Sequence, residues 1–403
     1  MQRREKAKGE AGLKFLLTLF LLALVVAAAA GAWLWYGITQ PYQGFGPAGV
    51  FVEVPHGASS RAVGRLLESN GVVRSAKAFE LYARRKSPRT VQAGEYYFDH
   101  GTSARAVFWK LAKGEVYEQP FTVHEGDTMF DIARELEKAK LLTREEFLAA
   151  ASDPTLVRDI APGVPTLEGF LFPATYHLSR HPAGAELTAE MVRKFKEEWA
   201  ALRTGSAAPA DAANATAPAS AAPGTGAMPT APSPDRVTFA DARPVLAVVT
   251  LASLVERETP RPEERPLVAG AFSNRLAKGM ALQCDPTVMY ALERVHKYRG
   301  SLSGKDLKFD SPYNTYEHAG LPPGPIGNPG EESLRAALQP AKTDYIYFVA
   351  NTHGGHFFAA TLAEHNRNVL KYRRLLSGAP EEEPVAQSTV NENAGPHHKG
   401  PTR

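Results

Sequence analysis

The chain of 403 residues contains a single cysteine, Cys284, which excludes an internal disulfide and a cysteine-based zinc site. The net charge is only +3, because 46 Lys and Arg residues are balanced by 43 Asp and Glu residues. So small a surplus argues against a nucleic-acid-binding protein, which usually carries a concentrated basic surface. The sequence also has no Gly-rich phosphate loop, no Ser-His-Asp elbow and no Cys nucleophile, so those three kinds of chemistry are excluded.

Charge is absent from residues 15–36, an apolar run of 22 residues. At about 1.5 Å per residue, a helix of this length crosses the ~30 Å hydrocarbon core of a bilayer. Five Lys and Arg residues precede the run, and the first charge after it is Glu53. By the positive-inside rule, these features predict a single-pass anchor in the cell membrane, with a cytoplasmic N-terminus and a periplasmic or otherwise extracytoplasmic remainder. The small residues at 27–30 leave a cleaved signal peptide as the alternative.

An internal repeat follows the apolar run, since residues 54–68 align with residues 123–137 after a shift of 69 positions. Each copy reads as a short strand, a Gly turn, a Ser or Thr N-cap and an amphipathic helix. The pattern resembles LysM modules, small βα units that recognise glycans containing N-acetylglucosamine. The alternative is a packing repeat that binds nothing.

Two segments have a composition that disfavours folding. Residues 204–235 are rich in Ala, Pro, Thr and Ser and contain only two charged residues, and residues 378–403 are polar and rich in Pro and Gly. Neither segment can bury enough apolar surface to offset the entropy lost on ordering. We therefore predict a disordered insertion and a disordered tail.

The most informative segment spans residues 243–259. Apolar residues at 245–255 fall at every angle around a helix, which predicts a helix buried on all sides. Glu256 comes at its end, where desolvation disfavours the carboxylate and should raise the pKa of this group. A carboxylic acid that stays neutral near pH 7 can protonate a glycosidic oxygen. The alternative is a structural Glu paired with a cation such as Arg257 or Arg275.

Polar loops lie further along the chain, at 274–276, 279–287, 311–316 and 320–330. We expect them to form the walls of a cleft, with tyrosines for sugar stacking and amides for hydroxyl or acetamido groups. The alternative is a set of surface turns with core tyrosines. The candidate substrate-binding residues in these loops are Asn274, Arg275, Gln283, Asp285, Thr287, Tyr313, Asn314 and Tyr316.

Two histidines, His353 and His356, are separated by two glycines. No third ligand sits at helical spacing nearby, so we interpret this segment as a hairpin turn rather than a metal pair. We expect no metal site and no cofactor.

Several motifs carry a family resemblance, and their order and spacing are specific. They include Leu251-Ala-Ser-Leu-Val-Glu-Arg-Glu-Thr259, Leu282-Gln-Cys-Asp-Pro-Thr-Val288, Tyr313-Asn-Thr-Tyr316 and Gly320-Leu-Pro-Pro-Gly-Pro-Ile326. The chain resembles the YceG-like family of endolytic murein transglycosylases over nearly all of its folded length. In that family the first Glu of the Val-Glu-X-Glu-Thr string is catalytic, which implies Glu256. The matching segment at 167–176 adds Glu168 as a substrate-binding residue, although Ala174 stands where the family usually has an acidic residue.

The resemblance implies a lytic transglycosylase that cleaves MurNAc–GlcNAc bonds within nascent peptidoglycan strands and so sets glycan length. One carboxyl would protonate the leaving oxygen and then take the proton of the C6 hydroxyl, closing a 1,6-anhydro ring without water. The implied partners are peptidoglycan, the cell membrane and peptidoglycan synthases (penicillin-binding proteins). Two alternatives stay open: a muramidase, with Asp285, Glu317 or Glu168 handling water, and a non-catalytic LysM-type wall-binding scaffold.

The predicted fold is α+β, with one transmembrane helix, LysM-like βα subdomains and a mixed α/β catalytic domain. In chain order we expect a basic tail (1–14), the anchor (15–36), a first LysM-like region (45–118), a second one (119–157), the catalytic domain (158–203 and 236–377) with its insertion (204–235), and the tail (378–403).

Overall fold

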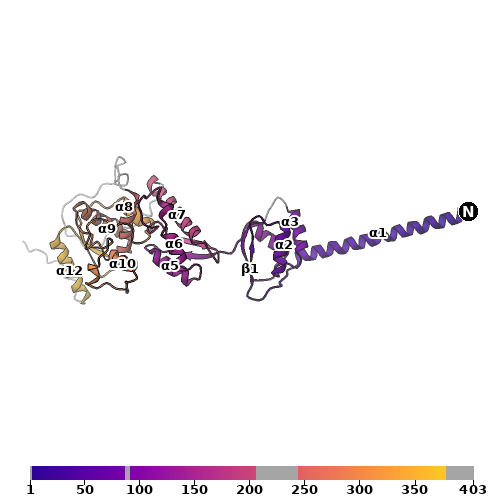
Figure 1. The fold of residues 1–403 in the computed structure, drawn as a ribbon, viewed down its shortest axis with the longest axis horizontal. Helices are drawn as coiled ribbons and strands as arrows, with labels where there is room; N and C mark the ends of the chain where they lie inside the picture. The colour runs from indigo at the N-terminus through magenta and orange to yellow at the C-terminus, as the bar shows by residue number, and fades with distance from the viewer. Residues whose placement is uncertain (1, 87–90, 206–243, 378–403) are drawn as a thin grey trace, which may run out of the picture. The chain divides into compact units, whose positions relative to one another are not determined.

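The computed structural model describes residues 2–86, 91–205 and 244–377 (Figure 1). The described chain is a mixed fold of helices and three two-stranded sheets, and it divides into two compact units. The first unit runs to Phe121 and includes Thr175–Pro182, and the second comprises Thr122–Ala174 and the chain from Ala183 onwards. The predicted insertion, apart from Thr204 and Gly205, and the predicted tail lie outside the described residues.

Helix α1 (Gln2–Thr39) contains the apolar run noted in the sequence. Its segment Phe15–Thr39 is long and apolar enough to cross a membrane, and it is not buried in a protein core. Helices that are apolar and exposed on all sides are typical of membrane spans. The helix is therefore suited to be the predicted anchor.

The first unit packs three short helices on one face of a two-stranded sheet. Strand β1 (Val50–Val54) pairs antiparallel with β2 (Gly94–Phe98), so that Val52 faces Tyr96 across the sheet. Alternate residues of both strands are buried against apolar side chains of the helices, as expected for a two-stranded sheet with one solvated face. The helices are α2 (Ser60–Ser69), α3 (Ala76–Arg85) and α4 (Ala104–Lys113).

Both copies of the predicted repeat form the predicted elements. In the first copy, β1 leads through Gly57, at φ +72°, to α2, whose N-cap Ser59 accepts a hydrogen bond from a backbone amide. In the second copy, β3 (Gln119–Thr122) leads through Gly126, at φ +82°, to α5 (Met129–Lys138), capped by Thr128. A positive φ requires Gly at the turn, and the hydroxyl caps fix where each helix begins. Their LysM-like binding role stays a prediction.

The second unit is mainly helical. Its remaining elements are α6 (Arg144–Ala151), α7 (Gly184–Thr204), α8 (Val245–Glu258), α9 (Arg265–Ala277), α10 (Asp285–Glu293), α11 (Glu331–Leu338), β5 (Tyr347–Ala350), β6 (His356–Ala359) and α12 (Leu362–Leu376). Strand β4 (Thr175–Leu178) belongs to the first unit and pairs with β3. The α5 copy of the repeat thus belongs to the same compact unit as α8.

Helix α8 lies at the centre of this unit and contacts α9, α10 and α11. All its residues at 248–255 are buried, which confirms the helix predicted from the continuous apolar pattern. The Ser253 hydroxyl accepts a hydrogen bond from the Ile326 amide at 3.1 Å, so the Pro- and Gly-rich loop is fastened directly to α8. The predicted hairpin is also confirmed, because β5 and β6 pair antiparallel around His353.

Candidate active site

Glu256 lies in the last turn of α8, and its side chain is only 4% exposed. One carboxylate oxygen, Oε1, accepts a hydrogen bond from Nη2 of Arg265 at 2.8 Å. The other, Oε2, accepts one from the backbone amide of Gly330 at 2.9 Å. Three separate segments of the second unit therefore meet at this carboxyl group.

The Gly330 amide belongs to the N-terminus of α11, where Gly330 is the N-cap and has no side chain to cap the helix. The carboxylate of Glu256 takes that role from a neighbouring helix. Unpaired amides and the helix dipole favour negative charge at a helix N-terminus. Ser333, in the first turn of α11, is fully buried, and its hydroxyl lies close enough to lower the pKa of Glu256 without a hydrogen bond of normal geometry.

Arg265 is shared by two carboxylates. Its Nη2 also contacts Oε2 of Glu125 at 3.1 Å, and the Glu125 side chain is 48% exposed whereas that of Arg265 is 7% exposed. The Nε of Arg265 is buried and has no hydrogen-bond partner among the described residues. The guanidinium thus joins a buried acid to an accessible one and keeps one donor unused.

Opposing effects act on the protonation of Glu256. Burial raises the pKa of Glu256 above its ordinary value, and the nearby Glu125 adds to this. Arg265 and the Gly330 amide lower it, but burial dominates. The raised pKa agrees with the prediction from the apolar helix, and it favours the neutral acid that a proton donor needs.

An open cavity of about 440 Å³ gives access to this group. Its lining residues are Glu125, Gly126, Asp127, Glu256, Arg257, Pro260 and Arg265. Burial also raises the pKa of Asp127. The cavity therefore combines three carboxyl groups and two guanidinium groups, a polar lining suited to a hydroxyl-rich ligand.

The turn of the second repeat copy forms one wall of the cavity. Nη1 of Arg257 donates to the carbonyl of Gly126 at 3.0 Å, which fastens this turn to the end of α8. A Cβ added at Gly126 would lie 3.5 Å from Cγ of Glu256. The turn thus packs directly beside the acid.

Glu258 has different surroundings from Glu256, as its position about 200° further around the helix predicts. Its Oε2 accepts a hydrogen bond from the thiol of Cys284 at 3.3 Å. Burial raises the pKa of Glu258 as well. However, Glu258 does not line the cavity, so the two acids of the Val-Glu-Arg-Glu string serve separate environments.

Four of the residues predicted to bind substrate have their polar atoms engaged in hydrogen bonds within the fold. Asn274 donates to the carbonyls of Thr343 and Tyr345, and Arg275 donates to those of Ile346 and Leu282. The others are Thr287, whose hydroxyl donates to the Cys284 carbonyl, and Asn314, which donates to the carbonyls of Leu307 and Phe309. Tyr313 is also buried, at 4% exposed, and its ring centre lies 4.7 Å from the guanidinium carbon of Arg294. These side chains shape the loops that were expected to wall a cleft.

Three other predicted residues meet at one accessible place. Gln283 and Asp285 are exposed on the same turn, and Gln283 has φ +49°. The Tyr316 hydroxyl donates to Oδ1 of Asp285 at 2.5 Å. Cys284, between the first two, contacts Glu258, which ties this turn to the end of α8. A substrate-binding role stays a prediction; Gln283 and Asp285 are exposed, as it requires, and Tyr316 is partly exposed.

Glu168, the remaining predicted site residue, is 1% exposed. Its carboxyl accepts a hydrogen bond from the Met129 amide at the start of α5 and another from Nδ2 of Asn328 at 3.0 Å. Burial raises the pKa of Glu168 to about 8. The side chain therefore joins α5 to the loop before α11, behind the turn that carries Glu125.

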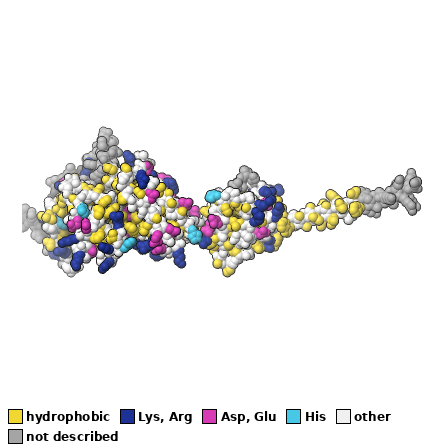
Figure 2. All heavy atoms as spheres, in the orientation of Figure 1, with side chains coloured by type: hydrophobic (Ala, Val, Ile, Leu, Met, Phe, Trp, Pro, Cys, Tyr) yellow, Lys and Arg dark blue, Asp and Glu magenta, His cyan; other side chains and the backbone are white. Residues whose placement is uncertain are grey.

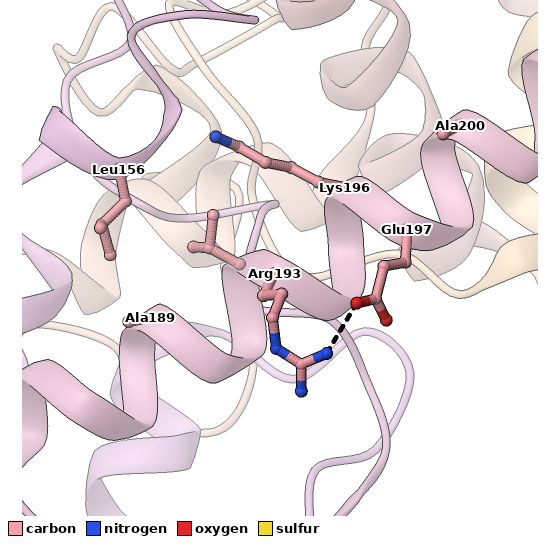
Figure 3. Close-up of a pocket in the computed structure, with 7 residues that line it drawn as sticks. Leu156, Ala189, Arg193, Lys196, Glu197 and Ala200 are labelled. Carbon is pink, nitrogen blue, oxygen red and sulfur yellow. Dashed lines mark hydrogen bonds and ion pairs between the residues drawn. The ribbon is translucent and has the colours of Figure 1, made fainter.

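Two hollows along α7 are similar in size to the cavity at Glu256, but no buried carboxyl group of the described residues lines them. They measure about 500 and 620 Å³, and Figure 3 shows the first, with Leu156, Ala189 and Lys196 beside an Arg193–Glu197 ion pair. The Glu197 carboxylate is exposed and paired with Arg193. Size alone does not mark the reactive cavity; the buried acid does.

Glu125, Asp127 and Arg265 were not among the residues predicted from the sequence. Glu125 and Asp127 could have been found by comparing the two repeat copies, because the aligned positions of the first copy hold His56 and Ala58. Two carboxylates in only one of two otherwise similar turns indicate a local function. Arg265 gives no comparable signal, because its contact with Glu256 depends on how the chain folds back after α8.

Comparisons with known proteins point to one family. The model of the YceG-like family matches residues 52–371. The chain belongs to the YceG-like family. It is 32% identical to an endolytic murein transglycosylase of Bacillus subtilis over 85% of this chain and 90% of that protein. A Streptococcus pneumoniae protein of the same name is 29% identical over 80% of this chain, which covers 58% of the pneumococcal protein. A crystal structure of a YceG-like protein from Listeria monocytogenes, 29% identical, covers 80% of this chain and 99% of that one, with a TM-score of 0.49.

Proposed function

We propose that this chain is a membrane-anchored endolytic murein transglycosylase that uses Glu256 as its general acid and base. The observation that carries the proposal is a buried carboxyl group with a raised pKa at the surface of a polar cavity. The names of the two bacterial relatives support the substrate class. The substrate would be the MurNAc–GlcNAc bond inside a peptidoglycan strand, and the products would end in 1,6-anhydro-MurNAc.

In the first half of the reaction, neutral Glu256 donates its proton to the glycosidic oxygen as the bond to C1 of MurNAc breaks. The resulting carboxylate is stabilised by Arg265 and by the amide at the start of α11. In the second half, this carboxylate takes the proton of the C6 hydroxyl, whose oxygen closes the ring on C1. The proton returns to Glu256, and no water is consumed.

Substrate binding follows from the accessible polar groups. Arg257 and Asp127 line the cavity together with the acid, and both can bond to sugar hydroxyls or the acetamido group. We place Gln283, Asp285 and Tyr316 at a further part of the binding surface. Gln283 and Asp285 are exposed on a turn linked to α8 through Cys284, and the Tyr316 hydroxyl donates to Asp285.

Localisation follows from the apolar helix. With residues 15–36 in the membrane and the N-terminus in the cytoplasm, the second unit would act on strands outside the cell membrane. Nascent strands emerge there, so cleavage within them would set their length. Peptidoglycan synthases, the penicillin-binding proteins, would be the partners that supply those strands.

A muramidase is a second candidate, and one observation favours it. Glu125 and Asp127 line the same cavity as Glu256, so a second carboxylate is available to activate water, as an inverting or retaining glycosidase requires. They are better placed for this than the buried Glu168. A scaffold without activity is the third candidate.

Mass spectrometry of digested peptidoglycan distinguishes these functions. Purified glycan strands incubated with the full-length protein should give 1,6-anhydro-MurNAc ends, whereas reducing ends would indicate a muramidase and intact strands a scaffold. Glu256→Gln should lower the rate roughly 10²–10⁴-fold, the usual contribution of general acid–base catalysis. Glu258→Gln is the matched control, since that residue does not line the cavity. Activity lost only in Glu258→Gln would contradict the assignment.

A further inference from the structure

The basic charge of this protein is concentrated on one part of the first unit. Residues 60–86 contain seven Lys and Arg against two Glu, a surplus of five, whereas the whole chain has a surplus of only three. All seven cations are exposed. Figure 2 shows Lys and Arg side chains gathered at the end of this unit from which α1 extends. We call Arg61, Arg65, Arg74, Lys77, Arg84, Arg85 and Lys86 the α2–α3 basic surface.

This surface lies beside the end of the apolar helix. The guanidinium carbon of Arg74 is 5.2 Å from the centre of the Tyr36 ring and 4.7 Å from that of Tyr42. A Cβ added at Gly37 would lie 3.3 Å from Cβ of Ala78 in α3, so α1 and α3 are in close contact. Aromatic residues at the end of a membrane span lie at the level of the lipid headgroups. Arg74, stacked on Tyr36, therefore lies at that level too.

A buried carboxylate, Glu80, lies beneath the α2–α3 basic surface and holds three of its cations in place. Glu80 is 3% exposed and forms ion pairs with Arg61 at 3.2 Å, Lys77 at 3.8 Å and Arg84 at 2.8 Å. Those three cations keep about 60% of their side-chain surface exposed. Glu80 thus fixes their direction while leaving them open to a second anion.

The remaining cations do not pair with Glu80, although the Lys86 ammonium lies 5.8 Å from the centre of the Tyr82 ring. Among the described residues, Arg65, Arg85 and Lys86 form no ion pair with a carboxylate. Leu81 is 41% exposed one turn from both Lys77 and Arg85 on α3. An apolar side chain surrounded by cations on one helix face is typical of helices that lie in the membrane interface.

We infer that the α2–α3 basic surface docks on the anionic phospholipid headgroups of the membrane that α1 crosses. The inference rests on the proposed anchoring by α1. Each Lys or Arg near an anionic bilayer surface contributes attraction that falls off within about 10 Å at moderate salt. Because α1 already holds this face at headgroup level, the contact needs no further ordering of the chain. It would restrain the first unit against the bilayer instead of leaving it to turn freely about the anchor.

The test uses the full-length protein in lipid nanodiscs with a fluorescent label on Leu81→Cys. The native Cys284 is buried and burial raises the pKa of its thiol, so labelling is confined to the new cysteine. Quenching by acrylamide, a neutral molecule, is compared between discs of phosphatidylcholine alone and discs containing roughly one-third phosphatidylglycerol. We expect quenching to fall at least about threefold in the anionic discs and to recover at about 1 M salt, where charges are screened within ~3 Å.

Two variants of equal charge provide the control. Arg65→Gln, Arg85→Gln and Lys86→Gln together should abolish the protection by anionic lipid. Arg158→Gln, Arg203→Gln and Lys278→Gln together remove three exposed cations of the second unit and should retain it. Equal quenching in both kinds of disc would overturn the inference, as would protection that appears only when peptidoglycan fragments are added. If the protein did not insert into neutral discs, α1 would not be a membrane anchor, and the inference that depends on that anchor would be wrong as well.

Discussion

Arg265 donates from Nη2 to Oε1 of Glu256 at 2.8 Å, and both side chains are almost completely buried. Removing one partner of a buried ion pair usually leaves an uncompensated charge, at a cost of about 3–5 kcal/mol. Here Arg265 keeps a second carboxylate, Glu125 at 3.1 Å, when Glu256 takes up a proton. The pair can therefore cycle between charged and neutral Glu256, which a single residue acting as both acid and base requires.

Arg265→Gln should move the alkaline limb of the pH–rate profile to higher pH. An opposite charge in contact lowers a carboxyl pKa by about 1–3 units, and this substitution leaves burial unopposed by the guanidinium. Glu256 then stays protonated further into the alkaline range. Its carboxylate, which forms after the first proton transfer, is less well stabilised without Arg265. We expect kcat/KM at pH 7 to fall about tenfold or more, as the loss of a charge-assisted hydrogen bond would produce.

The pH profile of kcat/KM on purified glycan strands measures this effect. Arg257→Gln is the matched control, because Arg257 lines the same cavity but bonds to the carbonyl of Gly126 instead of to Glu256. An alkaline limb that stays in place in Arg265→Gln, or moves equally in both variants, would contradict the role given to Arg265.

Glu125→Gln should move the same limb in the opposite direction. The negative charge of Glu125 raises the pKa of Glu256, and without it Arg265 is free to pair with Glu256 alone. The acid form is then lost at lower pH, so activity at pH 7 and above declines while activity at acidic pH is preserved. Glu135→Gln, an exposed and paired carboxylate of α5, should leave the profile unchanged. A shift to higher pH would show that Glu125 does not act through the shared arginine.

Gly330→Ala should reproduce the effect of losing Glu125. A Cβ at this position would lie 2.0 Å from Oε1 of Glu125, so the half-exposed side chain has to swing away from Arg265. The backbone of Gly330, at φ −76° and ψ 174°, suits alanine, which limits the cost in stability. In a Glu125→Ala background the alanine at 330 should cause no further shift of the pH profile. An additive shift would mean that the substitution acts by another route, such as the amide that bonds to Glu256.

The helix that carries Glu256 could be predicted because its signal is local. Eleven residues at 245–255 contain enough apolar side chains to cover every face of a helix, and burial on all sides follows. The same holds for the hairpin at β5 and β6 and for the hydroxyl caps of the repeat. Each of these depends on a few neighbouring residues, so pattern and structure agree.

The cavity itself could not be predicted from patterns of this kind. The turn with Gly126 and the Arg257 that holds it are 131 positions apart in the chain, and no local periodicity encodes their meeting. Polar residues were also ambiguous: Asn314 seemed as suitable for a sugar as Gln283, yet it is fully buried and donates to two backbone carbonyls. An amide in a polar loop can satisfy the backbone or bind a ligand, and only the packing around it decides.

Glu168→Gln should make the protein less sensitive to rising pH. Burial raises the pKa of Glu168 to about 8 in the folded protein from an ordinary value of 4.5. Below about pH 4.5 the group is protonated in both states, and between 4.5 and 8 only the unfolded chain ionises. The stability that Glu168 contributes is therefore complete at acidic pH and is lost as pH rises to about 8.

Gln retains the acceptor for the Met129 amide but cannot ionise, so the fall in Tm between pH 5 and 8 should be smaller in the variant. Thermal unfolding at several pH values measures this, with Glu137→Gln, an exposed carboxylate of α5, as the control. A steeper fall in Glu168→Gln than in the wild type would mean that the ionised carboxylate stabilises the start of α5, and that burial is not the dominant effect.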